Sequence, residues 1–258
     1  MEALYRTFSK RVKVLKELSI KVRNYNEKKY LQYVDHIILA NPPMGSKPYK
    51  SQSTTIIENF PKIEYLTPLE QIKKRKGNYI LYHGHIGPER GLKELVCAMK
   101  QVVSIVPSAS LNIVGAFRTK NFEDNIRNLI EELELKSSVI ITEQVPHSQI
   151  WGIINKHRVG VIPFRRTPLT EENTPTKLFE MMICGLELVV SKLPPAQFFL
   201  NNSVHWCEPD NINSISYSLI SALNAKDDLS NIYENQRLIK DKYNWERKQK
   251  DYLTLFKA

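Results

Sequence analysis

Residues 78–107 read NYILYHGHIGPERGLKELVCAMKQVVSIVP. The run 78–84 has the length and apolar content of a strand. A glycine-rich loop follows, and apolar residues then recur at helical spacing until Pro107. A strand joined to a helix by a short loop is one half of a βαβ unit. The stretch therefore favours an α/β fold with a parallel sheet.

The same alternation continues towards the C-terminus. Further strand-like runs lie at 109–115, 137–142, 157–164, 186–192 and 203–208. Apolar residues recur at helical spacing at 121–135, 147–157, 174–184, 211–225, 229–243 and from Trp245 onward. Strands that alternate with helices of this length form parallel sheets that are covered on both faces. We therefore predict a doubly wound, Rossmann-like α/β domain over residues 77–258, with its ligands at the carboxyl ends of the strands.

Residues 1–76 follow another pattern. Residues 3–30 have helical periodicity, and two short strand-like runs at 35–40 and 54–61 are separated by a loop rich in Pro, Gly and Ser. Residues 62–76 look like a linker that closes on a basic run. We expect a partial N-terminal α/β segment followed by a basic linker.

The net charge of +10 is concentrated in this first segment. Residues 1–76 contain 16 Lys and Arg against 7 Asp and Glu, and the remaining residues contain 21 against 20. We expect no nucleic-acid partner, because the aromatic residues of the first helix follow one side of it instead of interleaving with the basic residues. An anionic membrane surface fits the charge better, at about 1 kcal/mol per nearby Lys or Arg. A solvated helix face explains it equally well.

Composition excludes several classes of protein. The hydrophobic content of 42% is that of a globular chain, and no apolar run approaches the ~20 residues that span a bilayer. The charged N-terminus is not a secretory signal. Cys97, Cys184 and Cys207 are odd in number and set among apolar neighbours, which is typical of a reducing compartment. We expect a cytoplasmic protein, with binding to the inner face of the plasma membrane as an alternative.

The loop YHGHIGPERGL (82–92) is the first candidate site. Glycines such as Gly84 let backbone N–H groups approach a phosphate, and the following helix adds its positive end. Arg90 supplies a fixed cation for phosphate oxygens. His85 lies between them. A turn that carries a surface arginine is the alternative explanation.

The stretch EENTPTKLFEMMICG (171–185) is the second candidate. Asn173 or Thr174 is a suitable N-cap, and Pro175 suits the first helical position. Lys177 then lies in the first turn, where a cation opposes the helix dipole. An anionic ligand at this point would remove the conflict.

Three further residues complete this candidate. Thr176 shares the first turn with Lys177, and Glu180 lies on the same helix face, where it could accept hydrogen bonds from ribose hydroxyls. Glu172, in the preceding loop, could accept hydrogen bonds from a sugar. The alternative is a surface pair of Lys177 and Glu180, worth a few tenths of a kcal/mol.

The remaining motifs predict less. The loop 142–147 (TEQVPH) follows a strand and could line a base pocket through its backbone. His83, His85 and His147 are too widely spaced, with too few acids, to indicate a metal site, so we expect none. No nucleophile–histidine arrangement is visible.

In order along the chain, these motifs resemble those of the family 4 (group 1) glycosyltransferases of the GT-B fold. YHGHIGPERG matches that family's Y-x-G-R-L-x-x-E-K-G loop, with His85 in place of the usual arginine and Arg90 in place of the lysine. ENTPTKLFE is similar to the E-x7-E block, and YNWERKQKDYLTLF resembles the C-terminal crossover helix. The resemblance covers residues 78–258.

The resemblance implies a nucleotide-sugar (donor) binding domain. Arg90 and Lys177 would contact the donor diphosphate, Glu180 would hold the ribose, and Glu172 would contact the donor sugar. The residues that it places in catalysis are Glu172, Arg90 and Lys177, and those that it places in donor binding are Gly84, His85, Arg90, Thr174, Pro175, Thr176, Lys177 and Glu180. Transfer would retain anomeric configuration, without a metal or another cofactor, by electrostatic stabilisation of the leaving diphosphate.

The chain departs from the family pattern at three places. His85 titrates near neutrality, unlike arginine, so phosphate binding would be weaker or pH-dependent. LNIVGAF (111–117) replaces a turn that usually contains glycine and an acid. Residues 1–61 resemble only the tail of the acceptor-side N-terminal domain, so we expect residues 1–60 to dimerise or to bind a partner chain.

These observations predict the donor-binding portion of a retaining glycosyltransferase. The acceptor would be a glycan or a lipid-linked sugar, and the pathway bacterial surface polysaccharide synthesis. Two alternatives remain open. One is a non-catalytic nucleotide-sugar-binding subunit or remnant that needs a partner chain, and the other is a basic α/β module that binds membranes or polyanions.

Overall fold

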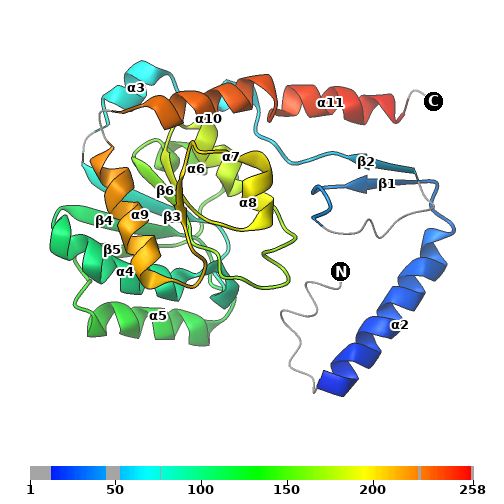
Figure 1. The fold of residues 1–258 in the computed structure, drawn as a ribbon, viewed down its shortest axis with the longest axis horizontal. Helices are drawn as coiled ribbons and strands as arrows, with labels where there is room; N and C mark the ends of the chain where they lie inside the picture. The colour runs from blue at the N-terminus through cyan, green and yellow to red at the C-terminus, as the bar shows by residue number, and fades with distance from the viewer. Residues whose placement is uncertain (1–12, 45–52, 76, 226–227, 257–258) are drawn as a thin grey trace.

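The computed structural model describes residues 13–44, 53–75, 77–225 and 228–256 (Figure 1). Its main sheet has six parallel strands in the order β5-β4-β3-β6-β7-β8. They are β3 (Asn78–His83), β4 (Ala109–Val114), β5 (Val139–Thr142), β6 (Val159–Ile162), β7 (Glu187–Ser191) and β8 (His205–Cys207). Each lies within a predicted strand. The chain runs outward from β3 to β5 and returns to β6 beside β3, so the predicted doubly wound topology is confirmed.

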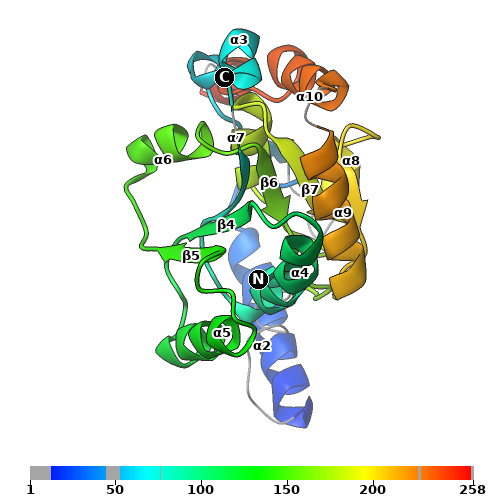
Figure 2. The ribbon, with the colours of Figure 1, turned by 90° about the vertical axis from the view of Figure 1, so that its left-hand side faces the viewer.

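Helices cover both faces of this sheet. The helices α4 (Leu92–Ile105), α5 (Lys120–Glu132) and α9 (Ile212–Asn224) pack on one face, and α6 (His147–Ile154), α7 (Lys177–Ile183), α8 (Pro194–Phe199) and α10 (Ser230–Asp241) pack on the other. Figure 2 shows α4 and α9 side by side, with α6, α7 and α10 on the far side of the strands. The helix α8, which two prolines open, was not predicted. Proline is in fact well tolerated in a first helical turn.

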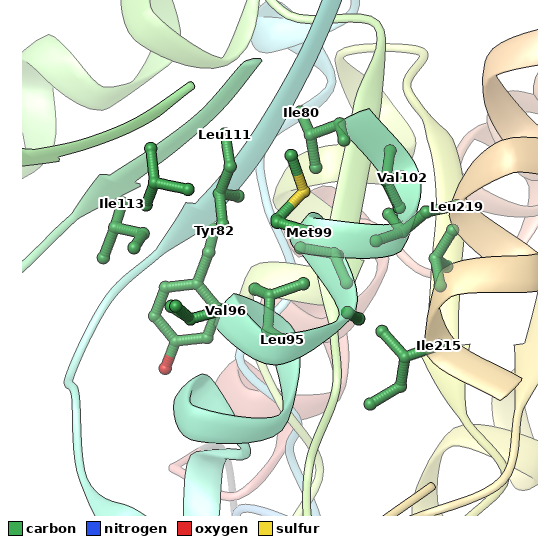
Figure 3. Close-up of a cluster of buried hydrophobic side chains, with 14 of the residues drawn as sticks. Ile80, Tyr82, Leu95, Val96, Met99, Val102, Leu111, Ile113, Ile215 and Leu219 are labelled. Atoms are coloured by element: carbon green, nitrogen blue, oxygen red, sulfur yellow. The ribbon is translucent and has the colours of Figure 1, made fainter. Parts of the chain in front are cut away.

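The core follows from strand alternation. Ile80 and Tyr82 point from β3 towards α4 and α9, where Leu95, Met99 and Leu219 meet them (Figure 3). All five side chains are fully buried. At about 25 cal/mol per Å² of apolar surface, such burial is the main force that holds the helices on the sheet. The loops after the strands are therefore held on a rigid frame.

The N-terminal segment forms its own small unit. The helix α2 (Lys13–Leu31) is followed by β1 (His36–Leu39) and β2 (Ser53–Ile56), which pair in parallel outside the main sheet. In Figure 1 these elements stand apart from the main sheet. The predicted helix over 3–30 is found from residue 13, and its first ten residues lie outside the described ranges. The expected partial α/β segment is therefore present.

The expected linker is partly folded. Residues 62–76 contain the 3-10 turn η1 (Ile63–Tyr65) and the short helix α3 (Leu69–Lys73). Arg75, in the basic run, is mostly buried and donates to the carbonyls of Cys184 and Gly185 at 2.6 and 2.8 Å. Part of the basic run is therefore structural.

The C-terminal helix α11 (Trp245–Thr254) runs beside the connecting segment. The backbone N–H of Trp245 donates to the carbonyl of Pro61 at 2.9 Å, and the N–H of Ile63 donates to the Glu246 carboxylate at 3.1 Å. The end of the chain is thus tied to the segment that leads from β2 into the main sheet. Among the described residues, no helix has both the length and the apolarity that a membrane crossing requires.

Candidate functional site

A cavity of about 490 Å³ opens at the carboxyl ends of β3 and β6, where the strand order reverses. We call it the main cavity. The predicted binding residues all line it, namely Gly84, His85, Arg90, Thr174, Pro175, Thr176, Lys177 and Glu180. Glu172 is exposed and is not among the lining residues. The structure therefore brings together two candidate stretches that are about 90 positions apart in the sequence.

Gly84 lets the loop after β3 pass close to the opposite wall. Its φ of +102° is left-handed, and a Cβ atom at this position would lie 3.1 Å from Nζ of Lys177. Gly115, after β4, lies so close to Gly84 that a Cβ atom there would be 2.0 Å from the Gly84 carbonyl oxygen. A side chain at Gly84 would press on the end of Lys177, and one at Gly115 would clash with the backbone of Gly84.

Lys177 carries the most unusual charge in the site. Its Nζ atom is buried and has no hydrogen-bond partner among the described residues. It lies 4.3 Å from the centroid of the Tyr82 ring and 5.5 Å from that of Phe164. Burial, and then repulsion from Arg90, lower the pKa of Lys177 to about 7. A buried ammonium group without a partner is the feature that a bound anion would satisfy.

Arg90 lies beside this ammonium group. Its guanidinium carbon is 4.5 Å from the centroid of the Phe164 ring, and its Nε is 3.2 Å from Oε1 of Glu89. The Phe164 ring thus contacts both cations, in the stacking geometry that arginine favours. Sequence reasoning missed Phe164 and Glu89. Phe164 is the last residue of a predicted strand, and this position at the carboxyl end could have indicated it.

Glu180 is held between two histidines. Its Oε1 is 2.9 Å from Nε2 of His147, and its Oε2 is 3.6 Å from Nε2 of His83. Burial, followed by the nearby Lys177 charge, lowers the pKa of His83 to about 3, so this ring is neutral. Glu180 is therefore oriented by the exposed His147 on one side, and on the other it faces the buried neutral His83, whose Nε2 has no hydrogen-bond partner among the described residues.

The start of α7 differs from the prediction. The helix begins at Lys177 after Thr176, whose side chain makes no capping hydrogen bond, and Pro175 lies before the helix instead of within it. Asn173 lies three positions before the N-cap residue and does not cap the helix; its Oδ1 accepts a hydrogen bond from Nδ2 of Asn41 at 3.2 Å. The predicted cap residue is therefore used to hold the N-terminal segment against the cavity.

The N-terminal segment and the loop after β5 also contribute to the main cavity. Ala40, Asn41 and Asn59 line it on one side, and sequence reasoning did not predict them. Gln144 and Val145 line it from the loop that was predicted to form a base pocket. No cluster of three or more His, Cys, Asp or Glu side chains in the described ranges is placed to hold a metal ion.

Comparison with known proteins identifies relatives of this fold. Residues 69–239 match the family described as "Glycosyl transferases group 1". Sucrose-phosphate synthase from Thermosynechococcus elongatus is 18% identical and superposes with a TM-score of 0.76, over 100% of this chain and 65% of that one. Anabaena HepE in complex with UDP is 16% identical, with a TM-score of 0.70 over 87% of this chain and 64% of that one.

A shorter structure also matches. The C-terminal domain of a group 1 glycosyl transferase from Francisella tularensis is 16% identical, with a TM-score of 0.59, and 98% of it superposes on 71% of this chain. This chain spans less than two thirds of the length of sucrose-phosphate synthase and of HepE. We found no match among curated protein sequences. The family match covers more than half of the sequence, and the chain therefore belongs to the group 1 glycosyl transferases.

Proposed function

We propose that this chain is the donor-binding portion of a retaining glycosyltransferase that uses a nucleoside-diphosphate sugar. The observation that carries the proposal is the buried Nζ of Lys177, which has no partner among the described residues and lies in a cavity that Arg90 also lines. Two cations at one end of a cavity suit a diphosphate, which carries several negative oxygens. Glu180, one turn further along the same helix face as Lys177, suits the ribose hydroxyls.

The same cations would assist the chemistry. As the bond between the sugar and the diphosphate breaks, negative charge accumulates on the leaving phosphate oxygen. Lys177 and Arg90 are already fixed near that charge by the aromatic ring of Phe164, so no reorganisation is needed when it develops. We therefore expect no divalent metal and no other cofactor to be required.

The donor sugar, the acceptor and the cellular role are less closely constrained. We keep Glu172 as the residue that contacts the donor sugar, and its exposed position would allow a loop movement to bring it to the ligand. We propose a glycan or lipid-linked acceptor, in bacterial surface polysaccharide synthesis at the cytoplasmic side of the membrane. The basic residues of the first segment support this location.

Nucleotide binding is the first test. HepE has been solved with UDP and with UDP-glucose, so UDP is the first nucleotide to titrate, followed by GDP and ADP, with EDTA present. We expect micromolar affinity for one of them. Sugar transfer would then be assayed with and without a candidate acceptor-side partner. Binding without any transfer would favour the alternative, a non-catalytic nucleotide-sugar-binding subunit, and the absence of binding would contradict both.

A further inference from the structure

The loop after β4 meets the loop after β3 beyond the ends of the two strands. The N–H of Ile86 donates to the carbonyl of Ala116 at 3.0 Å, and the N–H of Arg118 donates to the carbonyl of Ile86 at 2.9 Å. These backbone hydrogen bonds carry the pairing of β3 and β4 into the loops. As a result, Arg118 lies beside the loop that contains Glu89 and Arg90.

Arg118 binds Glu89 through both of its terminal nitrogens. Nη1 donates to Oε2 at 2.9 Å, and Nη2 donates to Oε1 at 2.6 Å. The Glu89 side chain is only 3% exposed, whereas that of Arg118 is 38% exposed. A paired fork of this kind is among the strongest side-chain contacts in proteins, and it engages both oxygens of the carboxylate. The carboxylate is therefore held by a residue outside the main cavity.

Space around this pair is also restricted. A Cβ atom at Gly87 would lie 2.7 Å from Oε2 of Glu89 and 2.8 Å from Nη1 of Arg118. Burial acts to raise the pKa of Glu89, but the hydrogen bonds from Arg118 and from the Glu89 backbone, together with the charges of Arg118 and Arg90, outweigh it, so the pKa is lowered and the carboxylate stays charged. The pair is thus tightly packed and ionised.

The remaining contact of Glu89 is with Arg90. Nε of Arg90 lies 3.2 Å from Oε1 of Glu89, and the terminal nitrogens of Arg90 make no hydrogen bond to a described residue. A lone carboxylate beside an arginine normally attracts those terminal nitrogens into a bidentate pair. Here Arg118 already occupies both oxygens, so Arg90 keeps its terminal nitrogens for another anion in the cavity.

We propose that Arg118 is a positioning residue for donor binding, which acts by occupying Glu89 and so leaves Arg90 available to the donor diphosphate. The inference rests on the proposed function. It gives a role to the loop after β4, which continues from the stretch 111–117 that departs from the family pattern. Without Arg118, the buried Glu89 carboxylate would draw Arg90 out of the cavity.

The test compares Arg118→Gln with the matched control Arg127→Gln. Arg127 forms a similar pair with Glu123, at 2.8 Å, on the exposed surface of α5. By isothermal titration calorimetry we expect Arg118→Gln to weaken nucleoside-diphosphate binding about tenfold, the typical value of one hydrogen bond to a charged group. Arg127→Gln should bind like the wild type. Binding of the nucleoside without phosphates should be unchanged in both.

A double variant separates positioning from a general structural role. If Glu89 captures Arg90 when Arg118 is absent, then Glu89→Gln combined with Arg118→Gln removes the captor and should restore most of the lost affinity. Circular dichroism melts of each variant establish that it is folded. The double variant leaves no unpaired buried charge, so it remains informative if the single variant does not fold.

Three results would overturn the inference while leaving the proposed function intact. They are diphosphate affinity unchanged in Arg118→Gln, an equal loss of affinity for the nucleoside and its diphosphate, and no recovery in the double variant. A wild-type chain that binds no nucleotide would instead overturn the proposed function, and the inference with it.

Discussion

Lys177 is the residue at which stability and binding oppose each other. Its buried ammonium group is disfavoured in the free protein, which lowers its pKa to about 7 from the ordinary value of 10.5. A bound diphosphate would favour the charged form. Above pH 7, binding must therefore take up a proton, and we expect nucleoside-diphosphate affinity to fall as pH rises from 6.5 to 8.5, by up to about tenfold per unit.

This pH dependence can be measured by calorimetry in two buffers of different ionisation enthalpy. At pH 8 the wild type should take up a substantial fraction of one proton on binding, so the binding enthalpies observed in the two buffers should differ. In Lys177→Arg, which is always charged, the two enthalpies should agree. Identical enthalpies in both buffers for the wild type would mean that Lys177 does not change its protonation on binding.

The same residue should limit the stability of the free protein. Because the pKa of Lys177 is lower in the folded than in the unfolded chain, its cost is greatest below pH 7 and disappears as pH rises towards the ordinary value for lysine. We expect Lys177→Met to raise the free energy of unfolding by on the order of 2 kcal/mol at pH 6.5, and by less at pH 9. Urea titration at both pH values checks this, and an equal change at each would contradict the assignment.

His147 offers a third prediction at this scale. Because its Nε2 lies 2.9 Å from Oε1 of Glu180, it fixes the carboxylate that we assign to the ribose. We expect His147→Ala to weaken binding of a ribonucleoside diphosphate several-fold, by about 1 kcal/mol, and binding of the 2′-deoxy analogue by less. Equal losses for the two ligands would show that His147 does not act through the ribose contact.

At the scale of elements, the segment before β3 is more than a connection. Arg75 donates to two carbonyls at the end of α7 and to Oδ1 of Asn155, at 2.6 to 2.8 Å. Removing it leaves buried acceptors unsatisfied, so we expect Arg75→Met to lower the free energy of unfolding by about 2–3 kcal/mol. Lys74→Met, at the neighbouring position, should change it by less than about 0.5 kcal/mol. Urea unfolding of both variants tests this, and similar values for the two would contradict a structural role for Arg75.

The sequence pattern predicted the main elements well, because burial of the sheet on both faces requires continuous apolar strands such as Ile80–Tyr82 and apolar helical stripes such as that of α4. It failed where tertiary contacts decide. Arg75 looked like part of a charged linker, because no local pattern shows which carbonyls it will meet. The cap of α7 was misplaced because the helix begins only at Lys177, and Asn173 instead contacts Asn41, more than 130 positions earlier.

The candidate site, too, was predicted from the sequence where its residues form a local pattern, and was missed where they do not. Its motif residues, such as Lys177 and Glu180, could be read from the sequence, because their spacing along one helix is local. The contacts of Arg118 and of the two histidines around Glu180 could not, because these side chains come from separate elements that only the order of the strands brings together.

At the scale of the whole molecule, the helix α2 presents apolar side chains to solvent. Leu15, Leu18, Val22 and Tyr25 are between 51% and 69% exposed, at positions that recur along the helix. Exposed apolar surface of this kind marks interaction sites. We therefore expect the chain to self-associate or to bind a partner chain through residues 1–60, and Leu18→Lys with Val22→Lys to weaken that association. Analytical ultracentrifugation tests this, and a wild-type monomer at all concentrations would count against self-association.

The most direct test of the central claim is calorimetric titration of nucleoside diphosphates into the wild type, Lys177→Met and Glu180→Ala. We expect micromolar binding of one nucleotide to the wild type and a loss of affinity of at least tenfold in each variant. Circular dichroism should show that both variants are folded like the wild type. A folded wild-type chain that binds none of the nucleotides, or variants that bind as tightly as the wild type, would contradict the assignment of the main cavity as a donor site.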